Sequence, residues 1–195
     1  MTEKFSLAPS TTALLVMDFQ TLIVEGFAVQ KDVLLERTAR LVEAARAAKL
    51  LVVYVVVGFR AGYPEVSSRN QSFGAFKGGG MFSAGSAGTE IHSALAPRPD
   101  EVVITKHRVS AFAGTDLDMI LRANNIETLV FAGIATSGVV LSTLRHAADC
   151  DYRLVVAEDC CSDRDDEVHL VLTGKVFPRQ ARVMSAADVI AAFQA

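Results

Sequence analysis

Two charged side chains, Asp18 and Lys106, follow apolar runs of the sequence and could together move a proton. Asp18 comes directly after the apolar residues 13–17, so we expect it at the carboxyl edge of a sheet, where partial loss of water raises a carboxyl pKa and suits the group to proton transfer. Lys106 follows the run 102–104 and Thr105. Facing Asp18 across neighbouring strand ends, its ammonium would keep the carboxylate ionised and stabilise developing negative charge. The structural alternatives are a turn cap for Asp18 and a solvated strand end for Lys106.

The turn at residues 133–143, Gly-Ile-Ala-Thr-Ser-Gly-Val-Val-Leu-Ser-Thr, joins an expected strand to an expected helix. Gly133 and Gly138 allow close backbone approach or positive φ, and a helix that begins inside the turn would direct free amides into a crevice. We expect the backbone amides of Ala135 and Val139 to hold a developing anion there. The Val139 side chain has no lone pair and no titratable proton, so it cannot act as a nucleophile.

Neither the cysteines nor the histidines form a recognisable cluster. Three cysteines without a secretory signal predict no disulfide framework and a reducing compartment. We expect Cys160 and Cys161 to pack at a strand end, and a nucleophile recruited from one of them is the alternative. Because the spacing of the histidines assembles no zinc site, we expect neither a metal nor a cofactor. The histidines are His92, His107, His146 and His169.

The composition indicates a globular chain without a nucleic-acid or membrane partner. Hydrophobic residues make up 51% of the 195 residues and charged residues 21%, and the formal net charge of −3 is spread along the chain. The longest apolar run, residues 50–57, has eight residues, whereas a membrane helix needs ~20. The first residues lack a signal-peptide pattern. We therefore expect one soluble, cytoplasmic domain over residues 1–195.

Apolar runs alternate with amphipathic stripes along the chain. The alternation with short connections predicts an α/β fold, a doubly wound parallel sheet with helices on both faces. Ligands of such sheets bind beyond the carboxyl ends of the strands, where Asp18 and the 133–143 turn are expected. Runs typical of buried strands occupy 12–18, 50–57, 102–104, 128–132, 154–157 and 181–184, and helical stripes occupy 34–48, 115–124, 137–149, 165–176 and 186–193.

Residues 58–88 interrupt this alternation with eight glycines and few periodic apolar residues. A stretch of this length is a lid, a subunit contact or a partly disordered loop. A phosphate loop with Lys77 is not supported, since neither glycine-rich phosphate motif is present. The segment has too many aromatic side chains to be freely solvated, so we expect it over the crevice or against a neighbouring subunit. These are Phe59, Tyr63, Phe73, Phe76 and Phe82.

Several of these motifs, in this order, resemble the isochorismatase-like hydrolase superfamily over about residues 10–190. They are Asp18 after an apolar strand, Lys106 within Thr-Lys-His-Arg-Val-Ser-Ala-Phe-Ala-Gly-Thr-Asp-Leu-Asp, the 133–143 turn, and Glu-Asp-Cys-Cys-Ser-Asp at 158–163. The resemblance implies a six-stranded, predominantly parallel sheet in a Rossmann-like three-layer fold. It also implies homodimers or larger homo-oligomers and a non-proline cis peptide between Ile134 and Ala135.

The resemblance also implies an Asp-Lys-Cys triad, onto which Asp18 and Lys106 map while Val139 stands at the cysteine position. The zinc-dependent nicotinamidases of the superfamily are less similar, because their Asp-x-His-x-His cluster has no counterpart after the second strand. Vinyl-ether-cleaving isochorismatases resemble this chain in keeping the aspartate and lysine without the thiol. Their small residue at that position makes room, whereas valine fills it.

Two hypotheses about function follow. The first is a metal-independent hydrolase of a small molecule, a vinyl ether, amide or ester, with Asp18 and Lys106 in proton transfer and charge stabilisation. The second is a small-molecule-binding or regulatory protein that keeps the hydrolase crevice but has lost turnover. The candidate oxyanion or substrate-binding residues in either case are Ala135, Gly138, Val139, Gln20 and Phe19.

Overall fold

The fold is an α/β sandwich around a six-stranded parallel sheet, which confirms the expected fold class. The structure is a computed structural model that describes residues 5–193. The strand order β3-β2-β1-β4-β5-β6 reverses direction between β1 and β4, and every adjacent pair is parallel. The strands are β1 (Thr12–Met17), β2 (Leu51–Val57), β3 (Val102–Lys106), β4 (Thr128–Ile134), β5 (Arg153–Ser162) and β6 (Arg182–Met184).

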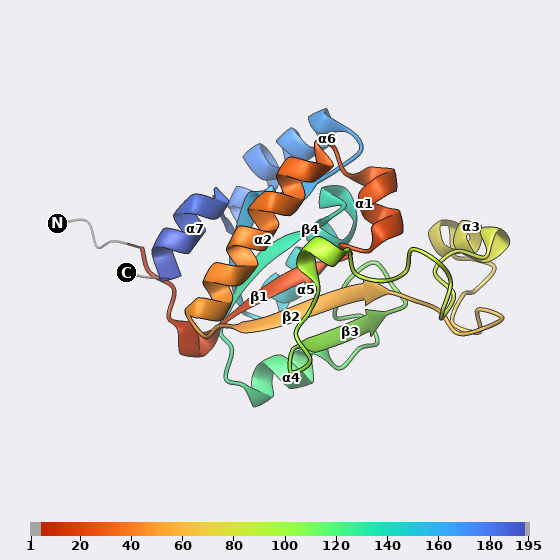
Figure 1. Ribbon diagram of the computed structural model, residues 1–195, viewed down its shortest axis with the longest axis horizontal. Coiled ribbons are helices and arrows are strands. Elements are labelled where there is room, and N and C mark those ends of the chain that lie inside the picture. The colour runs from red at the N-terminus through yellow and green to blue at the C-terminus, as the bar shows by residue number, and fades with distance from the viewer. Residues whose placement is uncertain (1–4, 194–195) are drawn as a thin grey trace.

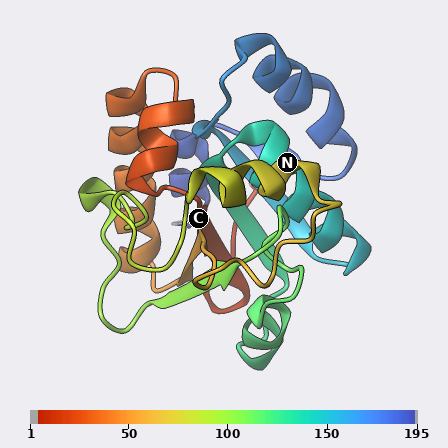
Figure 2. The same ribbon diagram turned by 90° about the vertical axis from the view of Figure 1, so that its right-hand side faces the viewer.

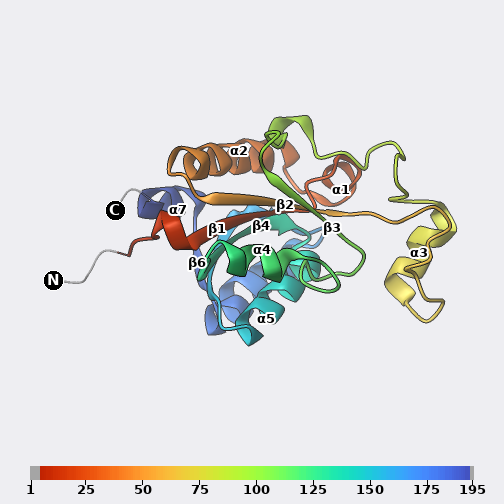
Figure 3. The same cartoon turned by 90° about the horizontal axis from the view of Figure 1, so that it is seen from below.

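Helices cover both faces of the sheet in three layers. Figure 3 shows α1, α2 and α7 above the strands and α4 and α5 below them. All five expected helices are present, α7 with the expected bounds and the other four with shifted ends. Helix α1 was not expected, because its short sequence has no sustained stripe. The helices are α1 (Thr21–Phe27), α2 (Lys31–Ala47), α3 (Gln71–Gly79), α4 (Leu117–Ala123), α5 (Leu141–Asp149), α6 (Asp166–Val171) and α7 (Ala186–Phe193). Within residues 5–193, none has the length and hydrophobicity needed to span a membrane.

The central strand β1 shows why its sequence is apolar throughout. Leu14 and Val16 belong to the core under α1, α2 and α7, and Leu15 and Met17 belong to the core under α4 and α5. All six residues of β1 are buried, since successive side chains point to opposite faces and both faces are covered. Two hydrophobic cores therefore hold β1 rigidly and place the residue that follows it.

Strand β5 continues past the expected end at residue 157. Its pairing with β4 shifts register between Phe131 and Gly133 and then resumes with Gly133 opposite Cys161. The sequence does not predict this continuation, because Glu158 and Asp159 interrupt the apolar run that is typical of a buried parallel strand. The extension carries Cys160 and Cys161 into the two cores.

The expected lid segment at residues 58–88 contains a helix, which corrects the expectation of a region without periodic structure. Helix α3 begins after Asn70, whose side chain accepts a hydrogen bond of 3.0 Å from the Phe73 amide. It stands beyond the carboxyl ends of β2 and β3 at one end of the molecule (Figures 1 and 2). Phe76 packs on Phe73 and Phe82, with ring centroids 5.6 and 5.1 Å apart. The aromatic side chains therefore pack together over the carboxyl edge of the sheet.

Candidate active site

Asp18 and Lys106 meet at the carboxyl edge of the sheet, as the sequence predicted. The Lys106 Nζ atom lies 2.9 Å from Asp18 Oδ2, and the two side chains are only 3% and 7% exposed. The strands that carry them are not neighbours, however, because β2 lies between β1 and β3. Val57 at the end of β2 pairs with Lys106, so the lysine side chain reaches over that strand to the carboxylate.

Burial is the main influence on the Asp18 carboxyl group. Desolvation raises its pKa, while the charge and the hydrogen bond of Lys106 act in the opposite direction. Lys106 Nζ also donates to the carbonyl of Arg108 at 3.2 Å. Asp18 Oδ1 is buried and has no hydrogen-bond partner among residues 5–193. This oxygen is therefore the acceptor in the pair that a ligand or a reacting water could use.

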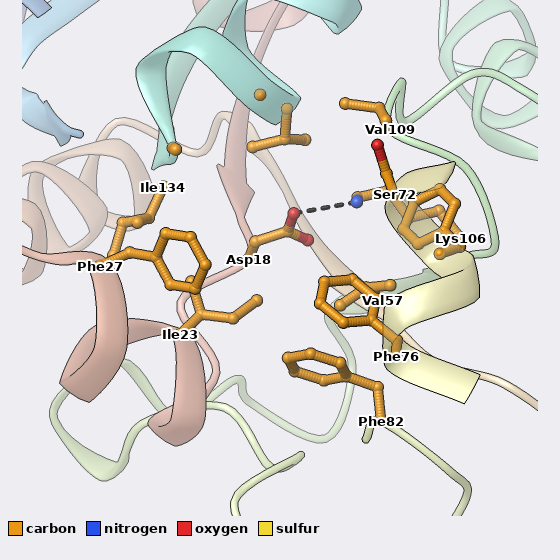
Figure 4. Close-up of a pocket in the computed structure, with 14 residues that line it drawn as sticks. Asp18, Ile23, Phe27, Val57, Ser72, Phe76, Phe82, Lys106, Val109 and Ile134 are labelled. Atoms are coloured by element: carbon orange, nitrogen blue, oxygen red, sulfur yellow. Dashed lines mark ion pairs between the residues drawn. The ribbon is translucent and has the colours of Figure 1, made fainter. Parts of the chain in front are cut away.

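The ion pair opens into a cavity of about 170 Å³. Figure 4 shows the Asp18 carboxylate amid apolar side chains, with its dashed contact to Lys106. The walls come from α1, from the ends of β2 and β4, from the 136–140 turn and from the lid. The lining residues are Asp18, Ile23, Phe27, Val57, Ser72, Phe73, Phe76, Phe82, Lys106, Val109, Ile134, Ala135, Gly138 and Val139.

The turn after β4 approaches β1 closely at Gly133. A Cβ atom there would lie 3.1 Å from the Met17 carbonyl oxygen and 3.1 Å from Val140 Cγ2, so glycine is needed for space. Neither Gly133 nor Gly138 has positive φ, which corrects that part of the expectation. The irregular helical turn Thr136–Val140 precedes α5, which begins only at Leu141.

The amides of this turn are partly used within the protein. Ser137 donates through its amide and its hydroxyl to Asp163 Oδ2, each at 2.7 Å. The Gly138 amide donates to the Ala135 carbonyl at 3.0 Å. Gly138 therefore lines the cavity, but its N–H group is already used within the turn. The Ala135 amide is not among the donors of the turn and loop hydrogen bonds within residues 5–193. The Ile134–Ala135 peptide is cis, as the family resemblance implies.

Val139 lines the cavity together with Asp18 and Lys106, and its side chain is 2% exposed. A valine methyl group thus occupies the place where the resemblance puts a thiol. Burial raises the Cys160 pKa to about 12 and also raises the Cys161 pKa, and neither residue lines the cavity. A nucleophile recruited from these two cysteines is therefore not supported, since the thiolate is the reactive form.

Two expected binding residues, Phe19 and Gln20, lie outside the cavity. Phe19 is 1% exposed and packs in the core under α1 and α2. The Gln20 amide donates to the carbonyls of Val57 at 3.0 Å and Thr89 at 2.7 Å, and its oxygen accepts from the Val57 amide at 2.8 Å. These contacts tie the start of α1 to β2 and to Thr89, the residue that follows the lid segment. We therefore assign both residues to support of the site.

Sequence reasoning missed the walls contributed by α1, namely Ile23 and Phe27. Their signal was weak, because one short helical turn carries too few apolar positions to show a period. The aromatic side chains of residues 58–88 were expected over the crevice or against a neighbouring subunit, and three of them, Phe73, Phe76 and Phe82, line the cavity. Among residues 5–193, no group of three or more His, Cys, Asp or Glu side chains is arranged to hold a metal ion.

The chain is similar in sequence and in structure to known proteins. Residues 12–188 match the isochorismatase domain model. The chain is 34% identical over 182 residues to an uncharacterised isochorismatase family protein of Escherichia coli O157:H7, covering 92% of this chain and 95% of that protein. It is 35% identical over 180 residues to a ureidoacrylate amidohydrolase of Acinetobacter baylyi, covering 82% and 74%. An isochorismatase family structure from Burkholderia thailandensis superposes with a TM-score of 0.82 at 31% identity, covering 99% and 100%.

Proposed function

Because the chain belongs to the isochorismatase domain family, we propose that it hydrolyses a small molecule with Asp18 as the proton-transfer group and water as the attacking nucleophile. The observation that carries this proposal is the buried Asp18–Lys106 ion pair, 2.9 Å long, at the base of an otherwise apolar cavity. Perturbed carboxyl groups of this kind gather at functional sites. The amidohydrolase among the relatives favours an amide as the first substrate class to test.

For an amide or ester, Asp18 acts as a base. Its Oδ1 accepts a proton from water while the water oxygen bonds to the carbonyl carbon and the carbonyl electron pair moves onto oxygen. The amides of Ala135 and Val139 stabilise that oxyanion, and Lys106 keeps Asp18 ionised before the attack. When the carbonyl reforms, the bond to the leaving group breaks and Asp18 returns its proton to that group.

For a vinyl ether, Asp18 acts as an acid. The protonated carboxyl group gives its proton to the terminal vinyl carbon. Water then adds to the resulting oxocarbenium ion while the Asp18 carboxylate takes up the proton that this water loses, and the neutral hemiacetal breaks down to an alcohol and a carbonyl compound. No covalent enzyme intermediate is needed on this route. Burial supports the vinyl-ether route, because it raises the pKa of Asp18 and so favours the protonated carboxyl group.

A second candidate function is small-molecule binding without turnover. The observation that favours it is the buried Val139 in the cavity lining, at the position where the family resemblance implies a nucleophilic cysteine. A chain of this kind would keep the cavity and the ion pair and bind ligand reversibly. It would form no acyl intermediate.

The test is hydrolysis of amide, ester and vinyl-ether panels by the wild type, by Asp18→Asn and by a matched Asp118→Asn variant with native-like circular dichroism. We expect Asp18→Asn to lower kcat/KM by about 10²–10⁴-fold, the usual contribution of a positioned acid or base. Asp118 lies on α4 and does not line the cavity, so its variant should lose much less. Equal turnover by wild type and Asp18→Asn would refute proton transfer through Asp18. Ligand binding with no turnover of any panel would favour the binding protein.

A further inference from the structure

Two side chains outside the ion-pair cavity hold the turn at residues 136–140. Ala135 and Val139 line the ion-pair cavity. Asp163 and His169 line a different, polar cleft, yet both are hydrogen-bonded to the turn. The proton transfer proposed above uses neither of them, so their contacts with the turn need an explanation of their own.

Asp163 binds the turn through Ser137. Its Oδ2 atom accepts hydrogen bonds from the Ser137 amide and from the Ser137 hydroxyl, each at 2.7 Å. Asp163 is buried, so water competes weakly for these bonds, and a charged acceptor makes a hydrogen bond roughly twice as strong as a neutral one. The carboxylate reaches the turn because the pairing of β5 with β4 resumes after the register shift and ends with Ile134 opposite Ser162. Asp163 is the next residue and therefore lies beside the turn.

His169 binds the same turn through Thr136. The Thr136 hydroxyl is hydrogen-bonded to His169 Nδ1 at 2.9 Å, and Thr136 is fully buried. His169 lies on the short helix α6, whose start is capped by Asp165. The Asp165 side chain accepts hydrogen bonds from the amides of Glu167 at 2.9 Å and Val168 at 3.2 Å. A capped helix thus holds the imidazole ring against the turn.

These contacts fix the residue that offers an amide to the cavity. The Ala135 carbonyl accepts from the Gly138 amide at 3.0 Å and from the Val140 amide at 3.3 Å, so Ala135 moves together with the turn that follows it. In the proposed hydrolysis of an amide or ester, the Ala135 amide stabilises the oxyanion. Such a donor is effective only when its N–H group already points at the developing charge. A misplacement of ~1 Å can lower a rate by ~10²-fold.

From these contacts we infer that Asp163 and His169 are positioning residues for the Ala135 amide. Asp163 acts through Ser137 and His169 through Thr136, and neither touches the reacting atoms. The inference rests on the proposed function for its kinetic consequence, whereas the placement of the turn is independent of turnover. A purely structural role would lower the stability of a variant and leave the kinetics of its folded form unchanged. A positioning role lowers kcat with little change in KM, because the oxyanion exists only in the transition state.

The first test compares Asp163→Ala with Asp163→Asn, which remove the same charge. The asparagine oxygen still accepts hydrogen bonds from Ser137, whereas alanine offers no acceptor. On an amide or ester that the wild type hydrolyses, we expect Asp163→Ala to lower kcat by about tenfold to hundredfold and to change KM by less than about threefold. Asp163→Asn should keep most of the wild-type kcat. Equal kcat values for the two variants would overturn the inference.

Asp166→Ala is the control for the first test. Asp166 is exposed and lines the same polar cleft, and within residues 5–193 the hydrogen bonds between that cleft and the turn come from Asp163 and His169. We therefore expect Asp166→Ala to keep the wild-type kcat. A loss as large as that of Asp163→Ala would mean that the charge of the cleft matters and the contact with Ser137 does not.

Thr136→Val and Thr136→Ser test the second contact by itself. Valine has nearly the shape of threonine but cannot bond to His169, whereas serine keeps the hydroxyl. We expect Thr136→Val to lower kcat by about two- to tenfold, the scale of one neutral hydrogen bond, and Thr136→Ser to lose less. This pair still tests the inference if Asp163→Ala does not fold. Equal losses in the valine and serine variants would contradict a role for the His169 contact.

A third readout needs no turnover and uses a thiol on the turn itself. Val139→Cys supplies the thiol, in a Cys150→Ser background that removes the least buried natural cysteine. The pH dependence of iodoacetamide labelling, followed by intact mass, gives the thiol pKa. We expect this pKa to be at least about 0.5 higher with Asp163→Ala than with Asp163→Asn, because a displaced turn moves the thiol away from Lys106. Equal pKa values, or thiols that are unreactive in both variants, would overturn the inference.

The thiol and kinetic readouts separate this inference from the proposed function. If the wild type hydrolyses no substrate but the thiol pKa values of the Asp163→Ala and Asp163→Asn proteins differ as expected, the hydrolytic proposal fails and the positioning of the turn stands. If the wild type is active, both readouts must distinguish the two variants. An active wild type with no difference between them would support hydrolysis and refute the positioning role.

Discussion

Lys106 Nζ lies 2.9 Å from Asp18 Oδ2 although β2 separates the strands that carry the two residues. The contact is possible because Lys106 is the last residue of β3 and its long side chain crosses the end of β2. The pair is almost fully buried. A buried pair of this kind is sensitive to loss of one partner, since the other is left as an uncompensated charge.

Substitution Lys106→Met should therefore destabilise the protein by about 3–5 kcal/mol at pH 7, measured by urea denaturation. Lys106→Met combined with Asp18→Asn should recover much of this loss, because no buried charge remains. Burial raises the folded-state pKa of Asp18, so the stability that its protonation contributes is fully present below the unfolded carboxyl pKa of ~3.9 and is lost as pH rises through the folded value. The deficit of Lys106→Met should accordingly be smaller near pH 4 than at pH 8. An equal deficit at both pH values would contradict this account.

The pH profile of kcat/KM should distinguish the two proposed roles of Asp18. Amide or ester hydrolysis needs the ionised carboxylate, so activity should rise with pH through a midpoint above the usual carboxyl value, because burial raises this pKa. Vinyl-ether cleavage needs the protonated form, so activity should fall through the same midpoint. Any residual activity of Asp18→Asn should not show this rise or fall with pH. If the same change of kcat/KM with pH persists in the variant, the titrating group is not Asp18.

Restoring a thiol with Val139→Cys should create a reactive cysteine. Its neighbours are Lys106 and the start of α5, and such surroundings lower a cysteine pKa from ~8.5 toward ~3.5–7.5. Cys150 is the most exposed natural cysteine, so a Cys150→Ser background removes its signal. In that background, intact mass should show rapid iodoacetamide labelling of the Val139→Cys protein and little labelling of the Val139→Ser control. An inert thiol would mean that the cavity does not stabilise a thiolate.

The close approach at Gly133 should make this position intolerant of a side chain. Gly133→Ala places a Cβ 3.1 Å from both the Met17 carbonyl oxygen and Val140 Cγ2, and overpacking of this kind costs about 1–3 kcal/mol. Gly174→Ala is the matched control, since nothing lies within 4 Å of its Cβ. Thermal denaturation should show a lower Tm for the first variant and an unchanged or higher Tm for the second. Equal Tm values would show that the turn can move away from β1.

Self-association, which the family resemblance implies, stays a prediction. We expect a homodimer or a larger homo-oligomer by light scattering coupled to size-exclusion chromatography. A mass of one chain at every concentration tested would contradict it. Residue Leu170 on α6, which is 67% exposed, offers an apolar position whose change to Glu would test whether that helix contributes to the contact.

The sequence by itself determined the fold class, because strands buried on both faces of a parallel sheet must be apolar throughout. Residues 13–17 and 129–132 have this property, and the carboxyl ends of such strands meet at one edge. Asp18 and Lys106 could be predicted for the same reason, since each follows an apolar run and must lie at that edge.

Only the tertiary structure decided which expected residues face the cavity. Phe19 and Gln20 follow Asp18 directly, yet Phe19 turns into the core and the Gln20 side-chain amide donates to the carbonyls of Val57 in β2 and of Thr89. Phe27 of α1 is far in the sequence from Phe76 and Phe82 of the lid, yet all three line the cavity that holds the ion pair. Local sequence carries the period of a strand or helix, but the direction of a side chain after a strand and the contacts of a lid depend on long-range packing.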